Sequence, residues 1–187
     1  MLGALAAVPA MPALAQFRVE VSGVGLTQIP IALPAFRGEE GVSQKISEIV
    51  RADLERSGLF RNIPATGQAL DETSRPDMAE WRQRGADALA TGSVTRLTDG
   101  RYDVRFRLWD VVKAQDLGGQ GFVVVQGDLR LVAHRIADFI YEKLTGEKGI
   151  FSTRIAYVTK AGKRYVLWVA DADGENAQSA LSSTEPI

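Results

Sequence analysis

The chain offers few side chains of the types and spacing that catalysis requires. His134 is its only histidine, and it lies beside Arg135 on what the pattern indicates is the polar side of a helix. A Ser–His–acid triad would have to use this histidine, yet the G-x-S-x-G sequence that presents a serine nucleophile is missing. The 187 residues include no cysteine, which excludes a thiol nucleophile and a thiolate metal site. We therefore predict that His134 is either solvated or packed against its neighbours, and that the chain has no catalytic residue.

Three further motifs are better explained by structure than by ligand binding. The glycine-rich residues 118–121 suggest a phosphate loop, but no Lys-Ser/Thr follows, so we expect a strand bend. Glu39 and Glu40 lie in a glycine-bounded loop, where solvated charge is the default interpretation. Asp171 and Asp173 lack the later glutamate of a calcium loop, and a tight turn explains them better. We therefore predict no cofactor and no metal site.

The clearest strand in the sequence, residues 101–110, carries a candidate interface. Its apolar side chains alternate onto one face: Tyr102, Val104, Phe106 and Leu108. The opposite face carries Arg105, Arg107 and Trp109. Exposed arginine beside an aromatic ring is a composition that protein interfaces favour. A solvated sheet face is the alternative.

Two helices are predicted to pack on this sheet. The first spans residues 43–57, with Ser43 as its N-cap and an apolar stripe at helical spacing. The second begins after Asp128, whose carboxylate is expected to accept the first free backbone N–H groups. Gly146 occupies the position where a C′ glycine ends a helix.

The remaining patterns of the first part of the chain predict further strands and one short helix near residues 78–84. Pro30 and Pro34 lack a backbone donor, so the extended run that holds them suits a strand end or a sheet edge. The expected strands, besides residues 101–110, are 29–36, 59–63, 87–97 and 122–126. We therefore predict an α+β domain over residues 29–146. It holds a mixed sheet of about five strands with two long helices on one face, and its other face is open to solvent.

The last part of the chain has a different pattern. Three short strands at residues 154–159, 165–170 and 178–182 are joined by turns, one of them with a D-x-D-G sequence. This arrangement is typical of part of a β-propeller blade, which we place over residues 150–187. Because a lone blade leaves its strand edges unpaired, we expect this part to be poorly stabilised unless another chain covers it.

The N-terminus indicates export. Residues 1–15 are uncharged and apolar or small, and they end in an A-x-A cleavage site, as in a secretory signal peptide. A charged n-region is missing, so we expect the true translation start to lie further upstream. No stretch is long enough to span a bilayer, and we expect no direct membrane insertion. The net charge of −1 and the pI near 5.9 oppose a nucleic-acid partner.

Several of these stretches together resemble the TolB family of periplasmic propeller proteins, which belongs to the Tol–Pal envelope system. The resemblance covers essentially the whole chain. The most specific part is DFIYEKLTGEKGIFSTRIAYV, which begins at Asp138. The other matching stretches are QFRVEVSGVGLT, IPIALPAF, IVRADLERSGLFRNI and GADALATGSV.

The resemblance implies a non-enzymatic periplasmic adaptor that links inner-membrane TolA to outer-membrane Pal, in envelope integrity and cell division. It also implies an N-terminal domain similar in fold to an anticodon-binding domain, followed by a six-bladed propeller that carries the Pal site. Nearly all of that propeller is missing from this sequence, so no Pal-binding residue can be assigned. The family's TolA-binding segment matches the extended segment at residues 16–28, namely Gln16, Phe17, Arg18, Val19, Glu20, Val21, Ser22, Gly23, Val24, Gly25, Leu26 and Thr27.

The residues of this segment suit that role. Phe17, Val19 and Val21 alternate with polar residues ahead of a glycine-rich break. Such a peptide can add as a strand to the edge of a partner's sheet. It can also lie back on its own protein, and two docking places would make it a switch. The alternatives are a propeller-associated periplasmic hydrolase, a binding module for another envelope protein, or a nucleic-acid module.

Overall fold

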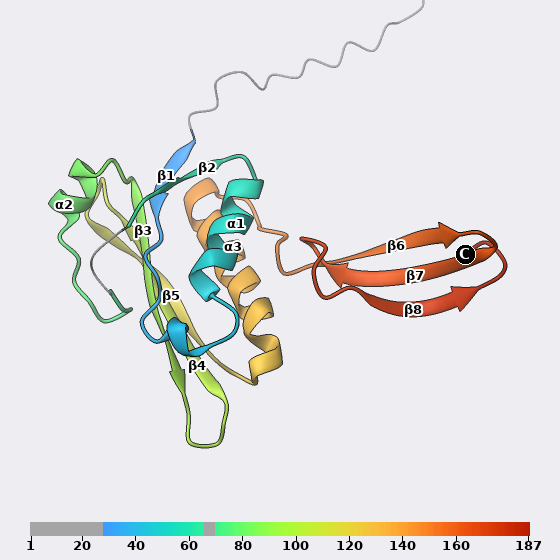
Figure 1. The fold of residues 1–187 in the computed structure, drawn as a ribbon. Coiled ribbons are helices and arrows are strands. Elements are labelled where there is room, and N and C mark those ends of the chain that lie inside the picture. The colour runs from blue at the N-terminus through green and yellow to red at the C-terminus, as the bar shows by residue number, and fades with distance from the viewer. Residues whose placement is uncertain (1–27, 66–69) are drawn as a thin grey trace, which may run out of the picture.

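The structure is a computed structural model that describes residues 28–65 and 70–187 (Figure 1). Within these ranges the strands form two sheets, one of five strands in the order β2-β1-β3-β4-β5 and one of three in the order β6-β7-β8. The first sheet contains β1 (Ile29–Ala32), β2 (Phe60–Ile63), β3 (Ala88–Arg96), β4 (Tyr102–Asp110) and β5 (Gln115–Val124). The helices are α1 (Ile46–Arg56), α2 (Met78–Gln83) and α3 (Leu129–Thr145), with short 3₁₀ turns at Glu39–Gly41 and Gln126–Asp128.

The prediction of a mixed five-stranded sheet with two long helices on one face is confirmed. β1 pairs in parallel with β2 and β3, whereas β3, β4 and β5 pair antiparallel. Helices α1 and α3 lie together on one side of the sheet (Figure 1). The extended run of residues 29–36 was expected at a strand end or an edge, but β1 is an inner strand. Pro30 fits there because pairing with β3 starts only at Ile31.

The expectation that the second face is open was wrong at one end of the sheet. The chain moves from β1 to β2 through α1, and then back across β1 to β3 through α2. Because parallel crossovers share one handedness, two crossovers that run in opposite directions place their helices on opposite faces. The buried Trp81 of α2 packs in a second small core with Leu89 and Val111.

The main core lies between the sheet and the pair α1 and α3. Tyr102, Val104, Phe106 and Leu108 of β4 are all buried toward this core, as their alternation predicted. Phe106 meets Phe139 of α3 edge to face, with ring centroids 5.2 Å apart. Each large apolar side chain buried here contributes about 1.5–3 kcal/mol to folding, so the two helices are held firmly on the sheet.

The glycine-rich residues 118–121, which were expected to lead into or bend a strand at residues 122–126, lie inside β5, because this strand begins earlier than predicted. β5 starts at Gln115 and pairs with β4 through a register shift at Leu108 and Trp109. A Cβ added at Gly119 would lie 2.0 Å from the carbonyl oxygen of Phe106. Glycine at this position therefore allows the two strand backbones to approach closely.

The predicted helix caps were partly wrong. Helix α1 starts at Ile46, three residues later than expected, and Ser43 does not cap it. Asp128 occupies the N-cap position of α3, but its side chain makes no capping hydrogen bond. Gly146 ends α3 with a φ of 81°, the left-handed conformation that glycine tolerates, as predicted.

The start of α1 is held by Glu39, which is buried and not solvated as predicted. Its carboxylate accepts hydrogen bonds from the backbone N–H and the hydroxyl of Ser47, at 3.0 and 2.5 Å. Lys45 donates to the Glu39 carbonyl oxygen over 2.9 Å. A loop carboxylate thereby supplies the acceptor that a capping side chain would provide.

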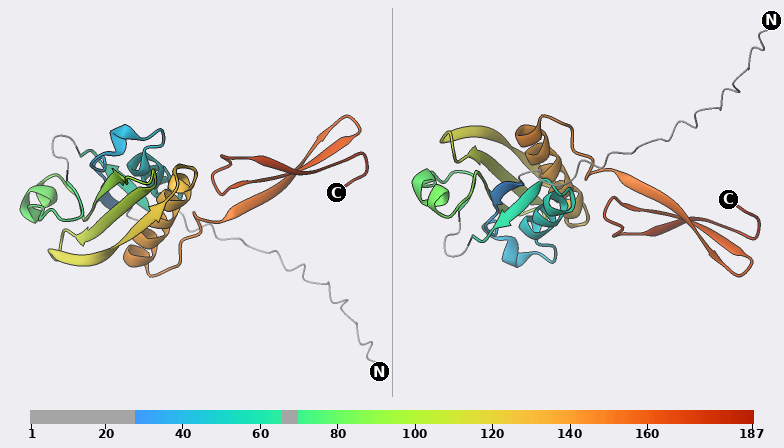
Figure 2. Two further views of the ribbon diagram at one scale, coloured as in Figure 1. Left: turned by 90° about the horizontal axis from the view of Figure 1, so that it is seen from below. Right: turned by 90° about the horizontal axis from the view of Figure 1, so that it is seen from above.

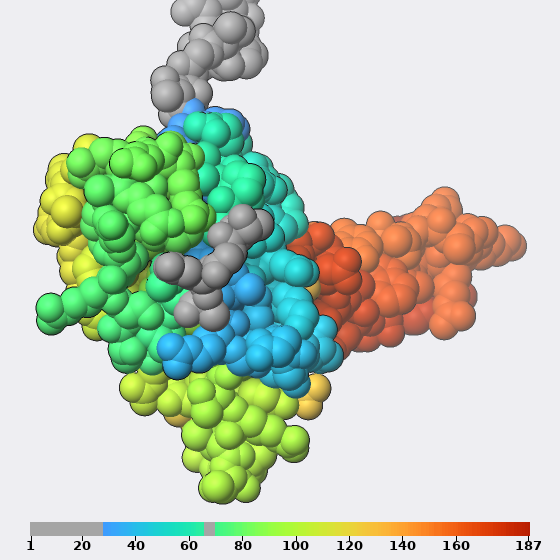
Figure 3. All heavy atoms as spheres, turned by 60° about the vertical axis from the view of Figure 1, so that its left-hand side comes forward, coloured from blue at the N-terminus to red at the C-terminus, as the bar shows by residue number. Residues whose placement is uncertain are grey.

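The second sheet is the predicted three-stranded antiparallel unit, which we call the blade. It consists of β6 (Arg154–Ala161), β7 (Arg164–Asp171) and β8 (Gln178–Ser183). The blade stands out from the α/β domain in both views of Figure 2, and every residue of β6 is exposed. The β3–β4 hairpin is a separate projection of the α/β domain (Figure 3). None of the helices in the described residues is long and apolar enough to cross a membrane.

Candidate functional site

The three residues of the predicted interface lie together on β4, on the sheet face turned away from α1 and α3. We call Arg105, Arg107 and Trp109 the outer face. Arg105 pairs with Asp103 over 2.9 Å, and Arg107 pairs with Asp116 of β5 over 2.5 Å. These two carboxylates balance both guanidinium groups, so the outer face has no excess positive charge for an acidic partner. Its role as an interface stays a prediction.

The predicted partner-binding segment, Gln16 to Thr27, lies outside the described residues. Its assignment therefore also stays a prediction. The description begins at Gln28, whose side-chain amide donates to the carbonyl oxygen of Gly58 over 3.1 Å. The chain therefore enters the α/β domain beside the end of α1, at the side of β1 that faces β2.

A cluster that the sequence did not predict joins the α/β domain to the blade. Its charged side chains come from two helices and from the turn between β7 and β8, far apart in the sequence. We call this group the junction cluster; it comprises Asp53 and Arg56 of α1, Arg130 and His134 of α3, and Asp171 and Asp173 of the blade.

His134 is at the centre of the junction cluster. It is 1% exposed, so of the two predicted roles it is packed and not solvated, and it does not lie on a polar side of the helix. Its Nδ1 lies 2.6 Å from Oδ2 of Asp53, and because an ionised carboxylate can only accept, Nδ1 carries a hydrogen. The other oxygen of Asp53 accepts a 2.9 Å hydrogen bond from Arg56. The carboxylate of Asp53 is thus paired on both sides although it is buried.

The small residues of α3 explain how a histidine comes to be buried here. Ala133 and Ala137 flank His134 on the helix and are fully buried. Small side chains let α1 and α3 approach closely, and Asp53 lies on the face of α1 that carries Val50 and Leu54. The sequence therefore places an acid and a base opposite each other inside an apolar contact.

The blade contributes the other half of the junction cluster. Arg130 forms an ion pair with Asp173, and its Nε lies 3.4 Å from Oδ2 of Asp171. Burial raises the pKa of Asp173. The N–H of Glu175 and the charges of Arg130, His134 and Arg56 lower this pKa, and together they outweigh burial. The net result is a pKa below the ordinary 3.8, so this carboxylate is ionised at neutral pH. The D-x-D turn predicted from sequence is present and has this additional contact.

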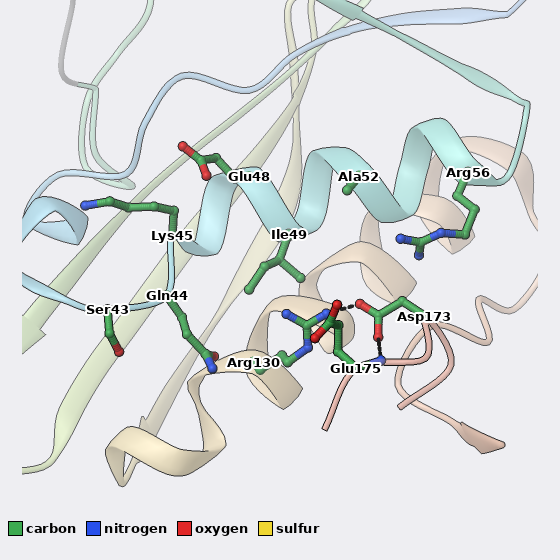
Figure 4. A pocket seen from close by; sticks show the side chains of 10 residues that line it. All are labelled: Ser43, Gln44, Lys45, Glu48, Ile49, Ala52, Arg56, Arg130, Asp173 and Glu175. Atoms are coloured by element: carbon green, nitrogen blue, oxygen red, sulfur yellow. Dashed lines mark hydrogen bonds and ion pairs between the residues drawn. The ribbon is translucent and has the colours of Figure 1, made fainter. Parts of the chain in front are cut away.

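A cavity of about 400 Å³ opens beside the junction cluster (Figure 4). Arg56 and Arg130 point into it near Asp173, while Lys45 and Glu48 of the α1 end lie at its far side. Its lining carries both signs of charge. No single class of small ligand is favoured by such a lining.

The segment between α3 and the blade is fixed to α3 by Asp138. Its two carboxylate oxygens accept the backbone N–H groups of Phe151 and Ser152, at 2.7 and 3.1 Å. Phe151 also packs edge to face on Tyr141, with centroids 5.6 Å apart. A Cβ at Gly149 would lie 2.4 Å from Oδ1 of Asp138. The blade is therefore attached to α3 at two places, this segment and the junction cluster.

The junction cluster is poorly suited to a metal ion. Asp53 meets Nδ1 of His134, whereas Asp173 lies 3.9 Å from Nε2. One ligand atom from each of Asp53, His134 and Asp173 lies within 4.8 Å of the other two, so spacing alone does not exclude an ion. Arg130 already occupies Asp173, and its positive charge opposes a cation there. The arrangement is suited to holding two parts of the chain together.

Sequence reasoning missed this cluster because its members are distant in the chain. Asp53 and His134 are 81 residues apart. One indication was present, since Asp53 follows Ile46 by seven residues and Val50 by three and so shares their buried helix face. A single acid on an apolar stripe indicates a buried partner, because an unpaired buried carboxylate is strongly unfavourable.

Comparison with known proteins identifies the family. A family model described as the TolB amino-terminal domain matches residues 17–117, which is more than half of the chain. The chain belongs to the TolB amino-terminal domain family. The matched region holds β1 to β4 and the start of β5.

Individual TolB proteins extend the similarity to α3 and the blade. The Tol-Pal system protein TolB of Albidiferax ferrireducens is 75% identical over 177 residues, which cover 95% of this chain and 42% of that protein. The TolB of Polaromonas naphthalenivorans is 69% identical over 184 residues, covering 98% of this chain and 43% of that protein. The crystal structure of TolB from Acinetobacter baumannii superposes with a TM-score of 0.73 at 33% identity, covering 85% of this chain and 40% of that one. The chain thus spans less than half the length of these relatives.

Proposed function

We propose that this chain is the N-terminal part of a non-enzymatic periplasmic adaptor of the Tol–Pal system. The observation that supports this most is the 75% identity to a Tol-Pal system protein TolB over 95% of the chain. In this proposal residues 1–15 are a signal peptide, residues 29–146 form the α/β domain and residues 150–187 begin a propeller. The complete protein would link TolA to Pal, with the Pal site on propeller parts beyond this sequence.

The environment of His134 supports an adaptor over a hydrolase. This residue is the only histidine of the 187 residues, and a Ser–His–acid triad formed within them would require it. Its Nδ1 is bonded to Asp53, and its buried Nε2 faces Asp173 of the blade. A carboxylate thus occupies the side of the ring where a serine nucleophile would stand.

The segment from Gln16 to Thr27 is proposed to bind TolA by adding a strand to the edge of a TolA sheet. In this mode main-chain hydrogen bonds give most of the affinity, and Phe17, Val19 and Val21 fix the register through pockets on the partner. Arg18 and Glu20 would point to solvent, because side chains alternate along a strand. The proposal therefore predicts that the two sets of side chains differ in importance.

This difference can be measured by binding to an immobilised soluble C-terminal domain of TolA. Replacing Phe17, Val19 and Val21 together by serine should raise the dissociation constant at least about tenfold, which is a loss of about 1.4 kcal/mol of binding free energy. The matched control replaces Arg18 and Glu20 by serine and should bind within about twofold of the parent. Equal losses in both variants, or a parent chain that does not bind, would overturn the proposed binding mode.

A further inference from the structure

The junction cluster contains a buried polar atom without a partner. Among the described residues, Nε2 of His134 has no hydrogen bond. The nearest opposite charge is Oδ2 of Asp173, 3.9 Å away on the blade. The other nitrogen of the same ring is already bonded to Asp53 of the α/β domain. One imidazole therefore stands between a carboxylate of the domain and a carboxylate of the blade.

The charges around His134 do not balance when the imidazole is neutral. The other members of the cluster are three carboxylates and two guanidinium groups: Asp53 and Arg56 from α1, Arg130 from α3, and Asp171 and Asp173 from the blade. These five groups sum to one negative charge. Glu175, the next acid of the turn, has an exposed side chain. A second proton on His134 would neutralise the cluster, and this is favourable because the imidazole and the Asp53 carboxylate are both buried.

We propose that the junction cluster is a proton-dependent link between the α/β domain and the blade. With hydrogens on both ring nitrogens, His134 donates to Asp53, and its positive charge attracts the Asp173 carboxylate 3.9 Å from Nε2, which holds the blade turn against α1 and α3. When Nε2 loses its proton, its lone pair faces a carboxylate, and the two repel. The blade turn is then held by Arg130 alone, and the blade swings about its second attachment at Asp138.

The direction of the pH effect follows from proton counting. The docked state holds one more proton than the released state, so docking is favoured as pH falls and is weakened as pH rises. The lowered pKa of Asp173 keeps its negative charge available down to about pH 4. Docking should therefore be stronger at pH 5.5 than at pH 8.5. This link does not depend on the proposed function, and it would set where the rest of a longer chain stands relative to the α/β domain.

The absence of cysteine from the sequence makes a distance measurement direct. Spin labels are attached to the double variant Thr98→Cys and Lys163→Cys, two exposed positions in the β3–β4 and β6–β7 turns. Electron–electron double resonance then gives the distribution of distances between them at pH 5.5, 7.0 and 8.5. We expect one narrow distribution at pH 5.5 and a broad one at pH 8.5. A distribution that stays the same across this range would overturn the proposal.

Two variants separate the link from general effects of pH. Asp173→Asn keeps the size of the side chain and its acceptor for the N–H of Glu175, but it removes the charge, so its distribution should be broad at every pH. Glu175→Gln is the matched control in the same turn and should behave like the parent. If Asp173→Asn responds to pH as Glu175→Gln does, Asp173 is not part of the link and the proposal fails.

The protonation state can be read independently because the chain has one histidine. Nitrogen-15 chemical shifts of the labelled imidazole show which ring nitrogens carry hydrogen. We expect both to be protonated at pH 5.5, with loss of the Nε2 proton over the same pH range in which the distance distribution broadens. A narrow distribution with only Nδ1 protonated, or one that disappears when EDTA removes divalent cations, would overturn the proposal.

Discussion

At the scale of single residues, the buried carboxylate of Asp53 depends strongly on its hydrogen-bond partners. It is 1% exposed and accepts from both His134 and Arg56. Removing one member of a buried charged pair leaves its partner uncompensated, which is far more unfavourable than losing a surface ion pair. The apolar stripe of α1 distinguishes Asp53 from the other acids of that helix. The sequence alone does not identify His134 as its partner, because the contact between them depends on how closely α1 and α3 pack.

Asp53→Ala should lower the free energy of unfolding by about 3 kcal/mol, because His134 Nδ1 loses its acceptor inside the core. Arg56→Ala is the matched comparison. Its side chain is 51% exposed, so its loss should lower the free energy of unfolding by less than about 1 kcal/mol. Urea unfolding followed by circular dichroism measures both values. Equal effects would show that Asp53 is held by Arg56 and not by His134.

A second residue-scale prediction concerns Asp71, whose pKa lies below the ordinary 3.8. The hydroxyl of Thr73 lowers it most, burial opposes this, and Ser74 and Arg37 lower it further. Because the folded-state pKa is depressed, the ionised side chain stabilises the fold above about pH 5, and this contribution is lost as pH falls below 3.8.

Asp71→Asn should therefore be less stable than the parent by about 1 kcal/mol at pH 6, and the difference should shrink toward zero at pH 3. Urea unfolding of both proteins at the two pH values gives the comparison. A difference that is the same at pH 3 and pH 6 would mean that the charge of Asp71 contributes nothing.

At the scale of elements, alternation and helical stripes predicted most of what the structure contains. The buried face of β4, the turn after β3 and the three strands of the blade follow from local patterns. The helix starts did not follow, because the group that holds α1 comes from a loop. Glu39 and Glu40 are neighbours with the same chemistry, and only packing makes one of them buried.

This neighbour pair provides an element-scale prediction. Glu39→Ala should lower the free energy of unfolding by about 2 kcal/mol, because the backbone N–H and the hydroxyl of Ser47 lose their acceptor at the start of α1. Glu40→Ala changes an exposed carboxylate and should stay within about 0.5 kcal/mol of the parent. Amide hydrogen exchange should show faster exchange in the first turn of α1 for Glu39→Ala alone. Comparable effects in the two variants would contradict the role given to Glu39.

At the scale of the whole molecule, the domain and the blade meet through contacts that no local pattern contains. The sequence predicted that the type of structure changes after α3. The structure shows that the blade is attached to α3 by Asp138, which binds the connecting segment, and by the junction cluster. The position of α2 on the second face of the sheet was likewise not predicted, although the handedness of parallel crossovers explains it once the strand order is known. Topology and interdomain contacts are thus what sequence patterns predicted least.

The most direct test of the adaptor function is a calorimetric titration of two chains, one beginning at Gln16 and one beginning at Ile29, with the soluble C-terminal domain of TolA. The longer chain should bind and the shorter one should show no detectable heat of binding. Their thermal unfolding should be nearly the same, which would show that the deleted segment is not a structural strand. Equal binding by both chains would contradict the assignment to Gln16–Thr27 and move the site to the α/β domain, with the outer face as the first candidate.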